Sequence, residues 1–168
     1  MTALAGVLIG GVATVATTYV AAGQQRKLQI AESDRVREDE LRKLRTSTYL
    51  AYMKAFNDLE NGVDALGTCH DNAGTEDQAV VAVKCQREST TIVLARKAEG
   101  VESDKIYVYG SKTAISASRE LDRTINVWLG DVLDYGPGDD SYHAYFLARE
   151  SFLDAVCSDV NTSNDRLC

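Results

Sequence analysis

The pattern of hydrophobic and charged positions divides the chain into regions of different character. Residues 2–25 carry no charged side chain, and residues 3–22 read ALAGVLIGGVATVATTYVAA. Twenty helical residues span about 30 Å, the hydrocarbon thickness of a bilayer. The pattern therefore predicts a transmembrane helix over residues 1–25. A buried helix of a soluble domain is one alternative. A cleaved signal peptide ending near Val20-Ala21-Ala22 is another, although no Lys or Arg precedes the apolar run.

Small residues recur every fourth position along this segment, at Gly6, Gly10, Thr14 and Thr18. Residues four apart share one face of a helix, and small side chains there let two helix backbones approach closely. The stripe predicts packing in the membrane, either against a second copy or against another membrane protein.

A charged stretch follows over residues 26–45, with seven Lys or Arg, five Asp or Glu, and no Pro or Gly. It predicts a juxtamembrane helix in which Arg26 and Lys27 can contact anionic headgroups. Because basic residues follow the apolar run and none precedes it, the positive-inside rule predicts that the body of the protein is cytoplasmic.

The next segment has apolar residues spaced alternately by three and four, which is the seam of a heptad repeat. Its members are Tyr49, Tyr52, Phe56, Leu59, Val63 and Leu66. We expect a core helix here, ending at Gly67, with a loop over His70–Gly74.

A second core helix is expected from Thr75, as N-cap, to Lys97, followed by a break over Gly100–Asp104. Residues 106–109 then predict a helical turn or an extended connector. The apolar face of this helix is expected to consist of Val80, Val81, Val83, Ile92, Leu94 and Ala95.

Two further helices complete the pattern. Gly110-Ser111 predicts a stop and an N-cap before a helix over Lys112–Leu133, and Asp140 or Ser141 caps a helix that runs to Val160. We expect the inward side chains of the last helix to be Tyr142, Tyr145, Phe146, Phe152, Leu153 and Val156. The fold class is therefore all-α, an antiparallel up-down bundle of about four helices over residues 46–160, with a tail at residues 161–168.

The four cysteines conflict with a cytoplasmic body. Cys69 and Cys85 flank the first expected loop of the bundle, while Cys157 and Cys168 lie near its last helix end. Two local disulfides are therefore conceivable, and disulfides persist in oxidising compartments. Following the positive-inside rule, we expect a single-pass protein of the cell membrane with a cytoplasmic bundle, and an extracytoplasmic bundle with disulfides is the alternative.

Composition narrows the choice of partner. The net charge of the 168 residues is −7, and residues 62–168 hold ten basic and eighteen acidic side chains. This balance argues against nucleic-acid binding and suits a basic protein partner.

The sequence contains no G-x-S-x-G, phosphate-loop, dinucleotide-binding or H-E-x-x-H motif. A zinc site built from Cys69, His70 and His143 would lack the paired spacing that zinc ligands usually show. We therefore expect no enzymatic activity, no cofactor, no metal and no small-molecule substrate.

The organisation resembles a loose class of short membrane proteins common in actinobacteria and their phages. The matching pieces are Arg26-Lys27, the segment Tyr49-Leu50-Ala51-Tyr52 with Phe56, and Gly110-Ser111. The resemblance implies a fold and a location, and it carries no catalytic residues.

Taken together, the sequence predicts a single-pass membrane-anchored bundle that acts through protein contacts, as an adaptor, assembly factor or accessory subunit. Two alternatives stay open. One is a phage-type immunity or exclusion protein that captures a basic effector, and the other is an extracytoplasmic binding or sensor domain stabilised by disulfides.

Overall fold

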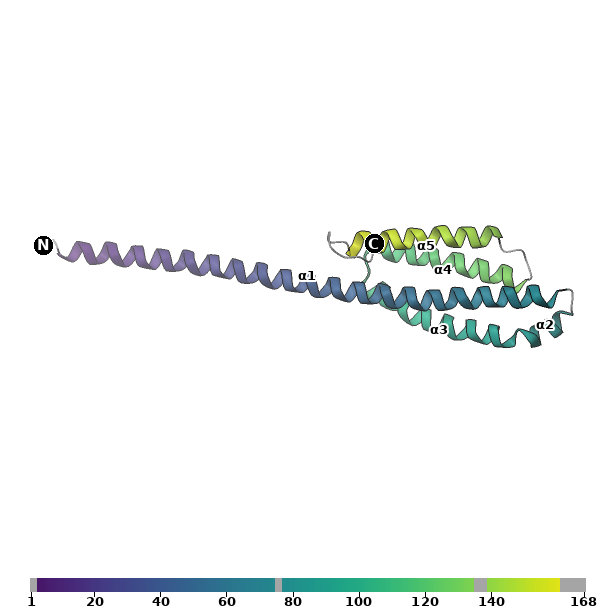
Figure 1. The fold of residues 1–168 in the computed structure, drawn as a ribbon. Coiled ribbons are helices and arrows are strands. Elements are labelled where there is room, and N and C mark those ends of the chain that lie inside the picture. Colours follow the sequence, from purple (N-terminus) through teal and green to yellow (C-terminus); the bar gives the residue numbers. More distant parts are fainter. Residues whose placement is uncertain (1–2, 75–76, 135–138, 161–168) are drawn as a thin grey trace. The chain divides into compact units, whose positions relative to one another are not determined.

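The computed structural model of the protein describes residues 3–74, 77–134 and 139–160, with side chains from residue 24 onward. Within these ranges the chain forms five helices and no strand, which confirms the all-α fold expected of a helical bundle (Figure 1). The helices are α1 (Ala3–Ala73), α2 (Gln78–Lys84), α3 (Gln86–Tyr109), α4 (Lys112–Leu133) and α5 (Asp139–Val160). The chain divides into two units, Met1–Arg42 and Lys43–Cys168.

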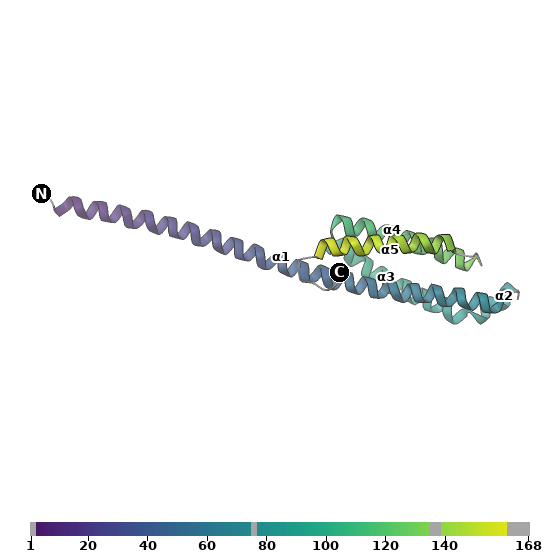
Figure 2. The same cartoon turned by 45° about the horizontal axis from the view of Figure 1, so that its top comes forward.

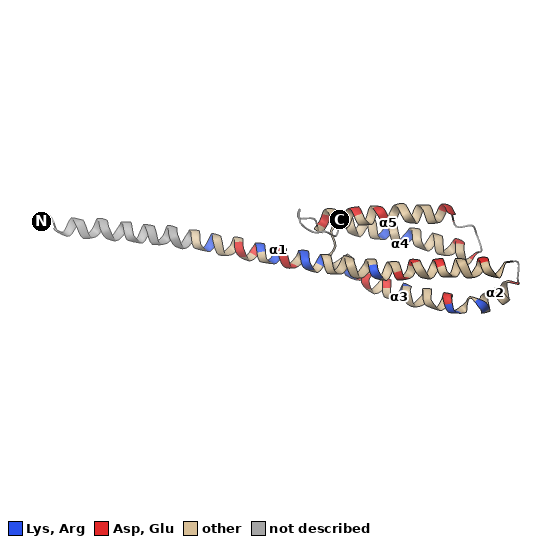
Figure 3. Cartoon of the chain, in the orientation of Figure 1, with Lys and Arg blue, Asp and Glu red and all other residues tan. Residues whose placement is uncertain are grey.

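In the first unit, residues 24–41 form an exposed stretch of α1 that carries both signs of charge (Figure 3). Ion pairs one turn apart, Glu32 with Arg35 at 3.4 Å and Asp39 with Arg42 at 3.5 Å, support the helix locally. In the described part of the chain, no helix is both long and apolar enough to cross a membrane. The predicted span and its stripe at Gly6, Gly10, Thr14 and Thr18 fall on residues whose side chains are not described.

In the second unit, contacts between distant residues define an antiparallel course. At one end, Arg45 at the start of this unit's part of α1 bonds Tyr109 at the end of α3 and Asp159 at the end of α5. At the other end, His70 contacts Val132 near the end of α4. Helices α4 and α5 lie side by side in both views of the bundle (Figures 1 and 2).

The core forms along the heptad seam of α1. All six seam residues from Tyr49 to Leu66 are at most 2% exposed, which confirms the predicted face. Aromatic rings fill the space towards α4 and α5: the Tyr52 and Phe152 ring centroids are 5.1 Å apart, and those of Trp128 and Tyr145 are 5.2 Å apart. Such pairs stabilise a core beyond the area they bury.

The end of α1 differs from the prediction. The helix does not stop at Gly67, and the loop predicted over His70–Gly74 is helical up to Ala73. Gly67 lies inside the helix and is therefore not its cap, and a Cβ atom there would make an ordinary contact of 3.8 Å with Val132 Cγ1. The helix ends instead at Gly74, whose φ of +61° is the left-handed conformation that glycine adopts readily.

The second predicted helix is also wrong in its bounds. Cys85 separates α2 from α3, Asp77 is the N-cap of α2, and α3 passes through the predicted break to end at Tyr109. The predicted N-cap, Thr75, lies outside the described residues. The helix continues because Ile92, Glu99 and Ile106, spaced by seven, keep one buried face towards the bundle.

Several side chains predicted to face the core are exposed, namely Val80, Val83, Leu94, Tyr142 and Phe146. The helix over Lys112–Leu133 and its N-cap, by contrast, are confirmed. The Ser111 hydroxyl accepts a hydrogen bond from the Ala114 amide, as a serine N-cap does.

Candidate functional site

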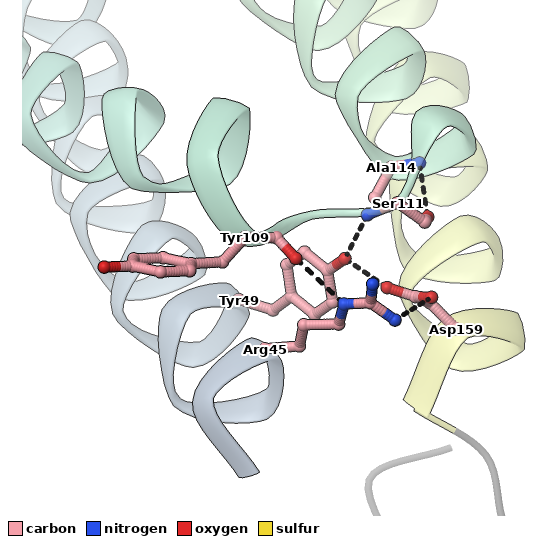
Figure 4. A network of polar contacts seen from close by, with 6 residues as sticks. All are labelled: Arg45, Tyr49, Tyr109, Ser111, Ala114 and Asp159. Atoms are coloured by element: carbon pink, nitrogen blue, oxygen red, sulfur yellow. Dashed lines mark hydrogen bonds and ion pairs between the residues drawn. The ribbon is translucent and has the colours of Figure 1, made fainter. Parts of the chain in front are cut away.

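A network of polar contacts joins three segments at one end of the bundle (Figure 4). Arg45 donates from Nε to the Tyr109 carbonyl at 2.8 Å and from Nη1 to Asp159 Oδ1 at 3.3 Å. The Tyr49 hydroxyl donates to Asp159 Oδ2 and accepts from the Ser111 amide, the latter at 3.1 Å. We call these five residues the end cluster. It connects α1 to the α3–α4 turn and to the last turn of α5.

The electrostatics of the end cluster keep Tyr49 protonated. Burial, with the hydrogen bond to Asp159, raises the pKa of Tyr49 to about 12. A neutral phenol can donate to the Asp159 carboxylate at every physiological pH. The cluster therefore acts as a fixed clamp rather than as a site of proton transfer.

An apolar hollow lies next to the end cluster, between α1 and α5. Tyr49 belongs to both, and Leu50, which is about half exposed, lies at the hollow as well. The remaining lining residues are Thr46, Met53, Leu153, Val156, Cys157 and Val160. The hollow offers apolar contact area and few polar groups that could orient a small molecule.

A second polar cluster lies inside the bundle, around Glu99 of α3. Arg96 bridges two carboxylates, with Nη1 3.0 Å from Glu99 Oε2 and Nη2 2.6 Å from Asp122 Oδ1. Tyr52 of α1 completes the group, which we call the interior cluster. Within the described residues, the Tyr52 hydroxyl and Glu99 Oε1 are both buried without a completed hydrogen bond.

Burial is the main cause of the raised pKa values in the interior cluster. It raises the pKa of Glu99 to about 7, and the negative charges of Asp122 and Asp104 act in the same direction. Arg96 and the neighbouring Tyr52 hydroxyl lower the pKa of Glu99 and limit the shift. The pKa of Tyr52 is itself raised far above its usual range by burial.

The structure joins Cys69 and Cys85 by a disulfide across 16 residues of sequence. This is one of the two local bridges that the sequence allows. It ties the last turns of α1 to the break between α2 and α3, where Cys85 is almost fully buried. Closing a loop of this length stabilises a fold by about 3 kcal/mol in the chain-entropy account.

The other site residues named from the sequence are placed as follows. Cys157 is also disulfide-bonded, whereas Cys168 lies outside the described residues. Arg26 and Lys27 are exposed. The stripe Gly6, Gly10, Thr14 and Thr18 lies outside the described side chains, so its predicted packing role stays a prediction.

The hypothetical zinc site at Cys69, His70 and His143 lacks one of its ligands in this structure. The Cys69 sulfur is held in the disulfide and cannot serve as a thiolate, and His70 Nδ1 lies 3.0 Å from the Val132 carbonyl oxygen. Across the part of the chain that is described, no three His, Cys, Asp or Glu residues form a group that could hold a metal ion.

Sequence reasoning missed both polar clusters. Arg45 was assigned to the charged stretch, although it lies four residues before Tyr49 and therefore continues the same seam. Its partner Asp159 is 114 residues away. Glu99 could have been found from its spacing of seven to Ile92 and Ile106.

The surface of the bundle exposes many large apolar side chains. Those on α3 and α5 include Val93, Leu94, Val101, Val108, Phe146 and Leu147. Comparison with protein-family models, with curated proteins and with solved structures finds no match to this chain.

Proposed function

We propose that the protein is a membrane-anchored helical bundle that acts through protein–protein contacts, as an adaptor, assembly factor or accessory subunit of a membrane complex. The observation that carries the proposal is the set of large apolar side chains on the outside of the bundle, which has its own closed core. Large apolar side chains that share one face of an exposed helix, as Leu94, Val101 and Val108 do, offer a contact site for another protein. The uncharged run over residues 2–25 supplies the expected anchor.

We further propose that the bundle lies on the oxidising side of the membrane. The disulfide between Cys69 and Cys85 supports this location because cytosolic reductants keep thiols reduced. The basic residues after the apolar run favour the opposite, cytoplasmic location. A disulfide at Cys157 is a second feature that favours the oxidising side. The second candidate function, an extracytoplasmic binding or sensor domain, follows from the same observation.

The anchor is tested by alkaline extraction of membranes from cells that express the full chain. We expect the wild-type protein to stay in the membrane pellet and a variant lacking residues 2–25 to appear in the soluble fraction. Release of the wild-type chain by alkali would refute the anchor.

The role of the small-residue stripe is tested separately. The double variant Gly6→Ile/Gly10→Ile should abolish any oligomer that the anchor forms in detergent, because bulky side chains hold the helices apart. The matched control is Ala5→Ile/Ala16→Ile, which adds similar bulk to the opposite face of the same expected helix. An oligomer that survives the first pair of substitutions would remove this role from the stripe.

A further inference from the structure

The outer face of α3 carries an exposed stripe with heptad spacing. Leu94, Val101 and Val108 are 64%, 55% and 70% exposed, and they recur every seven residues. Lys97 and Asp104, also exposed, occupy the intervening positions, so the spacings along the stripe alternate between three and four. This is the pattern of a helix that packs against another helix, yet the buried face of α3, around Glu99, lies on its other side.

Packing among the described residues does not require a glycine at position 100. Apart from its chain neighbours and the nearby backbone of its own helix, none of their heavy atoms lies within 4 Å of the place where its Cβ would be, so a larger residue would fit there. A glycine in a helix interior costs about 1 kcal/mol relative to alanine. Ala98 and Gly100 lie at the two edges of the outer face, one on either side of Val101. They leave room for a second helix backbone to approach closely.

The charges of the stripe indicate which helix fits. Lys97 and Asp104 lie on opposite sides of Val101, and neither takes part in an ion pair among the described residues. A two-fold axis through Val101 brings Lys97 of one copy next to Asp104 of the other, and Leu94 next to Val108. Parallel pairing would instead place like charges together, which is unfavourable.

We propose that the outer face of α3 is a self-complementary docking surface that binds α3 of a second copy in antiparallel orientation. The surface comprises Leu94, Lys97, Val101, Asp104 and Val108, with Ala98 and Gly100 at its two edges. The contacts of the pair use only residues of the second unit, so they can be tested without any contribution from the small-residue stripe of the anchor. The two-fold axis makes each helix of the second copy run in the opposite direction to that of the first. The first residues of the two bundles therefore lie at opposite ends of the dimer.

Charge exchange tests the proposal. The full chain with Gly6→Ile/Gly10→Ile is studied in detergent, where copies can meet in either direction and the anchor stripe does not contribute. Sedimentation equilibrium at low salt should show a reversible dimer. K97D or D104K alone should weaken it about tenfold, because each change places like charges across the two-fold axis. The double variant K97D/D104K should restore the dimer, and a mixture of the two single variants should form mixed pairs.

Recovery of the dimer in K97D/D104K distinguishes binding to a second copy of this chain from binding to a different partner. A foreign helix would not change its charges, so K97D/D104K would then fail to recover binding. A chain that stays monomeric up to roughly 100 µM, single variants that dimerise like the parent, or a double variant that stays dissociated would each overturn the proposal. Circular dichroism of each variant checks that the helices are retained, and G100L provides a second route to dissociation by bulk. The anchor experiments above do not depend on any of these outcomes.

Discussion

Tyr49 and Tyr52 lie one turn apart on α1 and are equally buried, but they belong to clusters of different character. In the end cluster, both Asp159 oxygens have donors, from Arg45 and Tyr49, and the Tyr49 hydroxyl also accepts from the Ser111 amide. In the interior cluster, the Tyr52 hydroxyl and one oxygen of Glu99 lack a completed hydrogen bond.

Burial alone therefore does not decide what a polar group contributes to the stability of the bundle. A buried group with its partners in place holds segments together, whereas a buried group without them carries a desolvation cost. The end cluster thus closes one end of the bundle. The interior cluster makes the stability of the bundle depend on a proton.

The largest expected effect is a change in the pH dependence of stability in Glu99→Gln. Glu99 has an ordinary pKa of 4.5 and a folded pKa of about 7, so the folded state favours its protonated form. The resulting stabilisation is complete below pH 4.5 and is lost as the pH rises through about 7. The unfolding free energy of the wild type, relative to Glu99→Gln, should fall by about 3 kcal/mol over this range.

Chemical denaturation at a series of pH values measures this difference directly. Glu102→Gln is the matched control, because it removes a partly buried carboxylate of the same helix that pairs with Lys105. A constant difference between the wild type and Glu99→Gln across the pH range would mean that Glu99 is as acidic as an exposed carboxyl.

Removing the central acceptor of the end cluster should have the next largest effect. Asp159→Ala deprives Arg45 and Tyr49 of their shared carboxylate and should destabilise the bundle by about 2 kcal/mol. Asp154→Ala, an exposed change on the same helix, should have little effect on the denaturation midpoint. Equal midpoints for the two variants would show that the end cluster does not hold α5.

Tyr49→Phe tests how much a single hydroxyl of the end cluster contributes to stability. It removes one donor to Asp159 and one acceptor for the Ser111 amide, so we expect a loss of about 1 kcal/mol. Thermal unfolding of the variant next to the wild type measures the loss. A gain in stability would contradict the clamp role of the end cluster.

The smallest effect is expected for the same substitution one turn away. Tyr52→Phe removes a hydroxyl that has no completed hydrogen bond, so stability at neutral pH should change by no more than about 0.5 kcal/mol. A loss as large as that of Tyr49→Phe would show that the two tyrosines have equivalent partners.

The sequence predicted elements well where local signals agreed. The bounds of α4 are correct because Ser111 caps it and its apolar positions alternate regularly by four and three. The heptad seam of α1 is correct for the same reason. In both cases the pattern lies on one helix and needs no information from its neighbours.

The sequence failed where a residue type conflicted with its position. A break was predicted from Gly100, yet α3 continues through it, and Glu99, which is absent from the predicted apolar face, is buried. The end cluster could not be predicted either, because Arg45 and Asp159 meet only after the bundle has formed. Leu94 was predicted to face the core, but it belongs to the exposed stripe on the outer face of α3.

The most direct test of the central claim, an anchored bundle on the oxidising side of the membrane, is thiol labelling of intact cells. A membrane-impermeant maleimide is applied before and after mild reduction, and Cys69→Ala/Cys85→Ala identifies the signal of this pair. Cys69 is partly exposed, so it can react once the disulfide opens. We expect the maleimide to label this pair of cysteines in intact cells only after reduction. Thiols that are free without reduction, and protected until the cells are lysed, would place the bundle in the cytoplasm and contradict it.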